Sequence, residues 1–138
     1  ITGATSGIGR AAAIAFSREG AQVSFCGRRE NLGREVEQQI RQQGGDATYI
    51  QADVTQPQQI QSFIDRTVEK YGRLDVAFNN AGDVLSKPLH EITVEEWDLA
   101  QNTNLRGVFL AMKYQIPHLL KQGGNIVITA SQHTVATR

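Results

Sequence analysis

The chain has 138 residues, 40% of them hydrophobic, which is enough for one globular domain with a hydrophobic core. Its 14 lysine and arginine residues are balanced by 14 aspartate and glutamate residues, so no excess of positive charge is present to hold nucleic acid or an anionic membrane, and we expect a small-molecule ligand. A single cysteine, the lack of an apolar run long enough to span a bilayer and the lack of a signal peptide at the start favour a reducing, cytoplasmic setting.

The first ten residues form a glycine-rich turn with the spacing Gly3-x-x-x-Gly7-x-Gly9, followed directly by an apolar helical pattern. Such a turn lets the backbone come close to a phosphate, and it leaves the first N–H groups of the helix free to donate to that anion. Thr5 and Ser6 can add hydroxyl donors. Three glycines before a helix can also serve packing alone, but the run of small residues that continues this helix favours a nucleotide.

A mononucleotide P-loop does not fit this turn. That motif needs Gly-x-x-x-x-Gly-Lys-Ser/Thr, whereas counting from Gly3 puts Ile8 at the position of the second glycine, with no lysine after it. The turn therefore favours a dinucleotide. We expect the cofactor to be bound by Gly3, Thr5, Ser6, Gly7, Ile8 and Gly9.

Helices and strands are expected to alternate along the first part of the chain. A helix over 7–19 ends at Gly20, a C-cap residue, and a strand follows at 22–26. A polar helix over 31–43 carries an apolar residue at every fourth position and leads to a short strand at 47–51.

Two sequences with the form of a capping box mark the later helices. Residues 55–58, Thr-Gln-Pro-Gln, are expected to start one helix with proline in its first turn, and residues 93–96, Thr-Val-Glu-Glu, to start the next. A strand at 74–78 lies between these helices. The long apolar pattern over 105–119 predicts a helix that a proline near its end kinks or terminates, and a final strand follows at 124–130.

This order of elements predicts an α/β fold, a Rossmann-like, doubly wound parallel sheet of about five strands with helices on both faces. Only Ile1 and Thr2 precede the glycine turn, where a strand of about five residues is expected. Little sequence follows the last strand. We therefore expect residues 1–138 to be a single dinucleotide-binding Rossmann domain, truncated at both ends.

Five motifs, in this order, resemble the short-chain dehydrogenase/reductase family over essentially all 138 residues. They are Thr2-Gly3-x-x-x-Gly7-Ile8-Gly9, Asp53-Val54, Asn79-Asn80-Ala81-Gly82, Asn104-Leu105-x-Gly107 and Ile126-Val127-x-x-x-Ser131. The resemblance implies an NAD(P)-dependent oxidoreductase that transfers hydride between the nicotinamide and a small-molecule alcohol or carbonyl substrate. It also implies a homo-oligomer, because relatives commonly pair as dimers or tetramers through the long helix over 105–119.

The resemblance assigns two of these motifs to the cofactor. Asp53 and Val54 would flank the adenine ring, although a carboxylate in a loop before a helix needs no ligand to explain it. In the second motif Asn79 would tie neighbouring strands together, while Asn80, Ala81 and Gly82 would lie along the cofactor; a polar turn at a strand end is the simpler alternative. Both motifs follow predicted strands, at the edge where open α/β sheets bind ligands.

The end of the strand at 22–26 bears on the choice between NADP and NAD. A preference for NAD usually requires an acidic residue there for the ribose 2′-hydroxyl, whereas NADP requires cationic donors for the extra phosphate. This chain has Gly27-Arg28-Arg29. Two adjacent arginines can simply be solvated, but at this position Arg28 and Arg29 favour NADP(H), with NAD(H) as the possible alternative.

For catalysis, the resemblance implies a serine on the substrate oxygen, an asparagine that holds a water in a proton relay, and a Tyr-x-x-x-Lys pair as general acid/base. Ser131 and Asn104 match the serine and the asparagine; a turn serine and a helix-surface asparagine are the alternatives. No tyrosine of this chain is followed by lysine four residues later. The family would place that pair beyond Arg138, so we expect the chain as given to be inactive.

Two other readings of the sequence are weaker. A non-catalytic dinucleotide-binding or regulatory module on the same fold would retain the glycine turn without the acid/base pair. No metal site is expected, because His90, His118 and His133 are scattered and Cys26 is isolated. His133, two residues after Ser131, is an ordinary loop residue or, less favourably, part of the substrate mouth.

Overall fold

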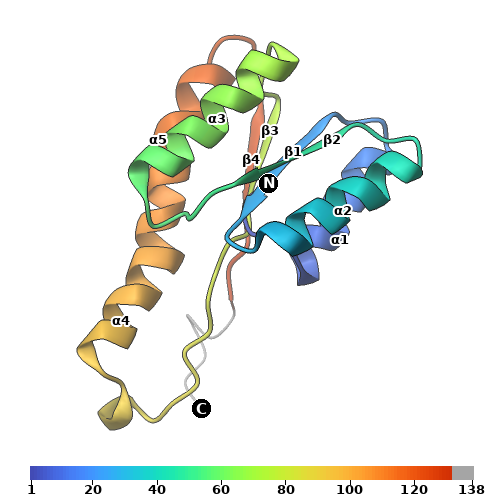
Figure 1. The fold of residues 1–138 in the computed structure, drawn as a ribbon. Helices are drawn as coiled ribbons and strands as arrows, with labels where there is room; N and C mark the ends of the chain where they lie inside the picture. Colours follow the sequence, from blue (N-terminus) through green and yellow to red (C-terminus); the bar gives the residue numbers. More distant parts are fainter. Residues whose placement is uncertain (132–138) are drawn as a thin grey trace.

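The computed structural model describes residues 1–131 and shows parallel strands that Thr2 joins into one layer (Figure 1). The strands are β1 (Val23–Gly27), β2 (Ala47–Gln51), β3 (Val76–Asn79) and β4 (Asn125–Ile128). β1 pairs with β2 and β3 pairs with β4, both in parallel, while Thr2 bridges Cys26 on one side and Asn79 on the other. The order across the layer is therefore β2-β1-Thr2-β3-β4, which confirms the predicted parallel α/β sheet, with its first strand present only as the Thr2 bridge.

Helices cover both faces of this layer. They are α1 (Gly7–Arg18), α2 (Glu30–Gln42), α3 (Pro57–Tyr71), α4 (Val94–Gln101) and α5 (Gly107–Leu119), with a 3₁₀ turn η1 at Leu89–Glu91 and a π turn η2 at Asn102–Arg106. Figure 1 shows α1 and α2 on one side of the strands and α3 and α5 on the other. Because side chains alternate along a strand, Tyr49 joins the cluster beneath α2 while Ile50 joins the cluster beneath α3.

The two predicted capping boxes have different outcomes. At α4 the box is confirmed, because the Thr93 hydroxyl accepts from the Glu96 N–H and the Glu96 carboxylate accepts from the Thr93 N–H. At α3 the prediction is wrong: the N-cap is Gln56, without a side-chain cap, and the Thr55 hydroxyl donates to Asp53 instead. The physical reason is competition, since the Asp53 carboxylate two residues earlier accepts from both the N–H and the hydroxyl of Thr55.

α4, η2 and α5 follow one another without a break and form a long helical arm that reaches beyond the strands (Figure 1). The π turn at Asn102–Arg106 was not expected from the sequence. Pro117 lies inside α5, and the helix ends two residues later at Leu119. The helix thus terminates close to the proline, although not at the proline itself. In the part of the chain that the structure describes, no helix has the length and apolar character that a bilayer crossing requires.

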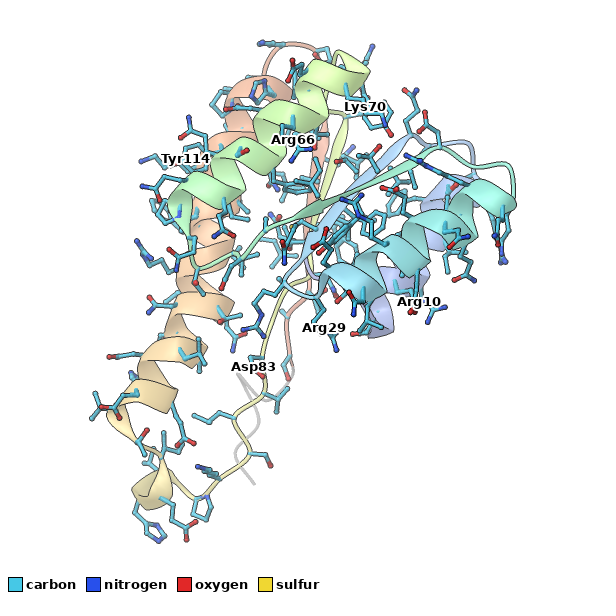
Figure 2. All side chains as sticks on the ribbon, viewed as in Figure 1. Arg10, Arg29, Arg66, Lys70, Asp83 and Tyr114 are labelled. Carbon is cyan, nitrogen blue, oxygen red and sulfur yellow. The ribbon has the colours of Figure 1, made fainter. Side chains whose placement is uncertain are left out.

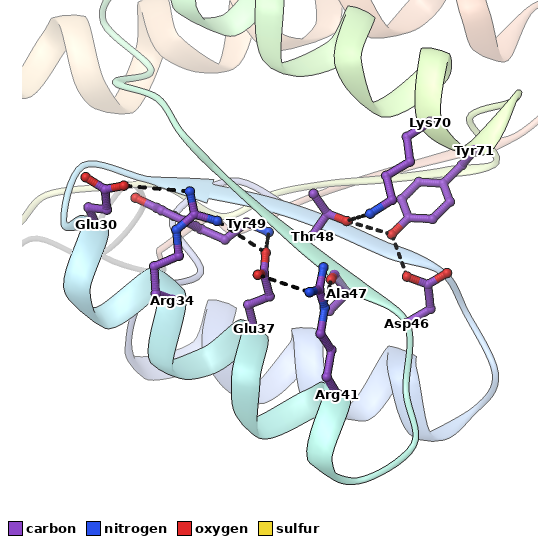
Figure 3. A network of polar contacts seen from close by, with 10 residues as sticks. All are labelled: Glu30, Arg34, Glu37, Arg41, Asp46, Ala47, Thr48, Tyr49, Lys70 and Tyr71. Atoms are coloured by element: carbon purple, nitrogen blue, oxygen red, sulfur yellow. Dashed lines mark hydrogen bonds and ion pairs between the residues drawn. The ribbon is translucent and has the colours of Figure 1, made fainter.

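The outer edge of β2 is closed by side chains of α2 (Figure 3). The Glu37 carboxylate accepts from the Tyr49 N–H, and Arg41 Nε donates to the Ala47 carbonyl at 3.0 Å. Backbone groups on a free strand edge would otherwise invite another strand. α2 is thereby fixed to β2, and the residues just before α2 and just after β2 contribute to the site described next.

Candidate functional site

The glycine loop, residues 3–9, packs against the segment that follows β3. Gly3 has φ +68°, and a Cβ built there would lie 2.6 Å from Ala81 Cα. A Cβ at Gly9 would lie 2.2 Å from the Gly3 carbonyl oxygen. Glycine is therefore required at both positions by backbone contacts, which bring the start of α1 next to the carboxyl end of β3.

A cavity of about 340 Å³ opens at this point, where the carboxyl ends of the strands meet. The predicted cofactor residues that line it are Gly3, Thr5, Ser6, Ile8, Arg28, Arg29, Asp53, Val54, Asn80, Ala81 and Gly82. Gly7 and Gly9 do not line it but shape the loop behind it. Thr2 lies between β1 and β3, so the strand order of the sheet reverses at this point. Open α/β sheets bind ligands at such a reversal, outside the carboxyl ends of the strands.

A larger hollow of about 420 Å³ lies at the opposite edge of the layer, between β1 and β3. The charged residues in its lining, Arg73 and Asp75, already form an ion pair with each other at 2.6 Å. No predicted site residue lines it. We therefore assign the ligand to the smaller cavity, where the glycine loop and the arginines converge.

Arg29 reaches back from the start of α2 to the glycine loop. Its Nη2 donates to the Thr5 hydroxyl at 3.1 Å and to the Ser6 hydroxyl at 2.6 Å. Arg28 is exposed beside it, and the Arg28 carbonyl accepts from Gln51 Nε2 at 2.9 Å. The Arg29 guanidinium thus stands next to the hydroxyl groups of the loop, and both arginine residues line the same cavity.

Asp53 and Val54 lie on the wall formed by the segment after β2. Asp53 Oδ1 accepts from the Thr55 N–H at 2.9 Å and from the Thr55 hydroxyl at 2.8 Å. The Asp53 carboxylate therefore organises the loop before α3, which agrees with the alternative that it is a loop carboxylate. Asp53 also lines the cavity. Val54 is buried, and a Cβ at Gly107 would lie 3.0 Å from its Cγ2, so Gly107 lets the helical arm pass close to it.

Asn80 connects three strand ends. Its Nδ2 donates to the Gly3 carbonyl at 3.1 Å, and its Oδ1 accepts from the Thr129 hydroxyl at 2.9 Å. The Thr2 hydroxyl accepts from the N–H groups of both Asn80 and Ala81. These bonds fix the spacing between the glycine loop, β3 and β4.

Asn79 ties neighbouring strands together, as expected, but through its backbone: it bridges Thr2 on one side and pairs with Ile128 on the other. Its amide is buried against α5, where Asn79 and Gln115 exchange two hydrogen bonds of 2.9 and 2.8 Å. The side chain points away from the strand layer because successive residues of a strand face opposite sides. It is Asn80, the next residue, whose side chain joins the strand ends.

The two candidate catalytic residues lie at different places. Asn104 is in the π turn, where its Oδ1 accepts from the Asp83 N–H and its Nδ2 donates to the Asp83 carbonyl, both at 2.8 Å. Its amide therefore fastens the helical arm to the segment after β3. Ser131 is exposed after β4 and is the last described residue, and neither residue lines the cavity.

Four further residues line the cavity and were not expected there from the sequence: Gly27, Ala52, Thr103 and Thr129. Gly27 ends β1, while Ala52 and Thr129 come directly after β2 and β4, so their positions at strand ends were a signal that could have identified them. Thr103 comes from the π turn and had no such signal.

Cys26 lies beneath the glycine loop and is fully buried. Burial raises the pKa of its thiol to about 11, so the group stays protonated and is a poor nucleophile or metal ligand. Within residues 1–131, no three His, Cys, Asp or Glu side chains come together in a way that could hold a metal ion. His133 lies outside the described residues.

Comparisons with known proteins agree with this geometry. The model of the short chain dehydrogenase family matches residues 1–138. An uncharacterized oxidoreductase of Thermotoga maritima is 38% identical over 131 residues, covering 95% of this chain and 51% of that protein. The chain thus spans about half the length of such relatives.

Two solved structures share the fold. A 3-ketoacyl-ACP reductase from Sinorhizobium meliloti 1021 is 38% identical with a TM-score of 0.90, covering 95% of this chain and 52% of that one. A variant of actinorhodin polyketide ketoreductase, solved with NADPH, is 36% identical with a TM-score of 0.91, covering 95% of this chain and 51% of that one.

Proposed function

Because this chain belongs to the short-chain dehydrogenase family, we propose that its cavity binds NADP(H) and that the intact protein transfers hydride between the nicotinamide and a small alcohol or carbonyl substrate. The observation that carries the proposal is the glycine loop, whose backbone lies on the cavity wall at the start of α1. Backbone N–H groups and the positive end of the helix dipole favour a phosphate at such a position.

The preference for NADP(H) over NAD(H) rests on the turn between β1 and α2. A Cβ at Gly27 would lie 2.5 Å from Thr5 Cγ2, so the end of β1 has no room for the acidic side chain that an NAD site uses. Arg28 and Arg29 stand beside it. The present partners of Arg29 are neutral hydroxyls, and a phosphate offers it stronger, charge-assisted bonds. The relative solved with NADPH supports this choice.

For the chemical step we propose that Ser131 contacts the substrate oxygen and that Asn104 acts through the backbone of the π turn. Two hydrogen bonds with Asp83 hold the Asn104 amide toward the segment after β3, and Asn104 does not line the cavity. π turns lack the regular i to i+4 bonds and are frequent at functional sites. None of Tyr49, Tyr71 and Tyr114 has lysine four residues later, and we propose that residues 1–138 alone bind the dinucleotide without turning over substrate.

The helical arm supports a homo-oligomer. Leu105, Phe109 and Ile116 are 67%, 56% and 41% exposed on η2 and α5. Their spacing of four and seven residues places them on one helical face, and apolar patches of this kind often mark interfaces. We propose that two copies pair through this face. The mass of the intact protein by sedimentation velocity tests it, and a monomer at micromolar concentration would oppose it.

Titration with NADPH and NADH tests the proposed cofactor. Replacing both Arg28 and Arg29 with glutamine removes at least two charge-assisted bonds, together worth about 3 kcal/mol at the low end, so NADPH should bind roughly 150-fold more weakly. Binding of NADH should change less than twofold. Arg66→Gln is the matched control, because Arg66 lies on α3, apart from Arg29 and the cavity (Figure 2). Equal losses for both nucleotides, or the same loss in the control, would refute the assignment.

A further inference from the structure

The turn that carries Arg28 and Arg29 is held by side chains from β2. The Tyr49 hydroxyl donates to the Gly27 carbonyl at 2.8 Å. Gln51 Nε2 donates to the Arg28 carbonyl at 2.9 Å. Two consecutive carbonyl groups of this turn are therefore bound by side chains of a neighbouring strand, in addition to the backbone bond from Ala52 to Gly27 at 3.2 Å.

Tyr49 has little freedom to point elsewhere. It is 1% exposed, and its ring lies directly under α2, where a Cβ at Gly33 would come within 2.2 Å of Cε2. The Phe25 ring is 5.6 Å away and the Arg34 guanidinium 5.3 Å from the ring centroid. Burial raises the pKa of Tyr49, which keeps its hydroxyl protonated and able to donate.

The other side of the turn rests on the glycine loop. Gly27 is so close to Thr5 that an added Cβ would lie 2.5 Å from its methyl group. Arg29 is bonded to the hydroxyls of Thr5 and Ser6. The backbone of the turn is thus clamped between β2 and the glycine loop, and the bases of both arginine side chains are placed by that clamp.

We propose that Tyr49 and Gln51 are positioning residues that set the preference of this site for a phosphate ester on the adenosine ribose. This inference rests on the proposed function, since it takes the Arg28–Arg29 turn as the binding site for the 2′-phosphate. A ligand with that phosphate requires both guanidinium groups to be positioned at the cavity. A looser turn lets these groups adopt more conformations, which raises the entropy cost of binding. A ligand without it is held by the glycine loop and is insensitive to the turn.

The test is Tyr49→Phe, which keeps the ring and its packing and removes the hydroxyl. The dissociation constants of NADPH and NADH are measured by titration on the intact protein. NADPH binding should weaken about threefold to fivefold, equivalent to about 1 kcal/mol for one neutral hydrogen bond, and NADH binding should stay within twofold of wild type. Gln51→Met, at an exposed position that can lose its amide without unfolding the chain, should act in the same direction.

Tyr71→Phe is the matched control. Its hydroxyl also bonds near β2, to Thr48 and Asp46, but at the amino end of the strand, away from the cavity (Figure 3). This variant should bind both nucleotides as wild type does. A general loss of stability would weaken the binding of NADPH and NADH together, so the ratio of the two dissociation constants separates positioning from general support.

Each outcome decides the question. A selective loss of NADPH affinity in Tyr49→Phe or in Gln51→Met, absent from the control, supports the proposal. Wild-type ratios in both variants overturn it while leaving the proposed cofactor intact, as long as the Arg28 and Arg29 double variant still loses NADPH. If wild type itself does not prefer NADPH, the proposed cofactor preference fails and this inference falls with it. If Tyr49→Phe does not fold, the result with Gln51→Met decides.

Discussion

Replacing Gly3 with alanine tests how closely the glycine loop packs against the segment after β3. A Cβ at Gly3 would lie 2.6 Å from Ala81 Cα and 2.9 Å from Ala81 N, at a backbone φ of +68°. Gly7 also has a positive φ, +54°, but a Cβ there meets nothing within 4 Å. Gly3→Ala and Gly7→Ala therefore share the backbone strain and differ in the clash.

The expected magnitudes follow from that difference. A left-handed backbone costs an alanine about 1–2 kcal/mol, and the stiffer unfolded chain offsets about 0.4–1 kcal/mol of this. Gly7→Ala should therefore lose about 1 kcal/mol of unfolding free energy. Overpacking adds about 1–3 kcal/mol, so Gly3→Ala should lose about 2–4 kcal/mol. Urea denaturation followed by circular dichroism measures both. Equal losses would refute the close approach of Gly3 to Ala81, and with it the observed shape of the cavity wall.

Two further predictions concern buried groups. Asn79→Leu leaves the Gln115 amide without its partner and should lower the free energy of unfolding by about 1–3 kcal/mol, while the double variant with Gln115→Leu should recover part of this in urea denaturation; strict additivity of the two single losses would contradict the pairing. The pKa of Cys26 is raised by burial from 9.0 to about 11, so the folded chain holds this proton more tightly than the unfolded chain and stability should fall as the pH rises from about 9 to about 11. In Cys26→Ala the free energy of unfolding should not show this fall between pH 9 and pH 11. The same fall in the variant and in wild type would argue against a buried, protonated thiol.

The predictions that succeeded depend on short stretches of sequence. The glycine loop and the Thr93 capping box are each encoded within about seven residues, so their spacing alone indicates their structure. The parallel sheet was predicted from the alternation of helix and strand patterns along the chain, and each of these patterns is also local. The capping box predicted at Thr55 does not form, although the sequence matches the motif. The Thr55 hydroxyl, which would have capped the helix, instead donates to Asp53, a residue just outside the motif.

What the sequence could not predict depends on contacts between distant residues. The π turn contains Asn104, whose amide is fastened to Asp83, 21 positions earlier in the chain. Thr129 reaches the cavity only because β4 pairs with β3 and brings it to Asn80. The clamp on the arginine turn is of the same kind, since Tyr49 lies 22 positions from the carbonyl that it binds.

A crystal structure of the intact protein with NADPH decides where the nucleotide binds. We expect the pyrophosphate against residues 3–9 at the start of α1, and the 2′-phosphate between the guanidinium groups of Arg28 and Arg29. Density for the nucleotide in the larger hollow between β1 and β3, or a 2′-phosphate that neither arginine contacts, would contradict it.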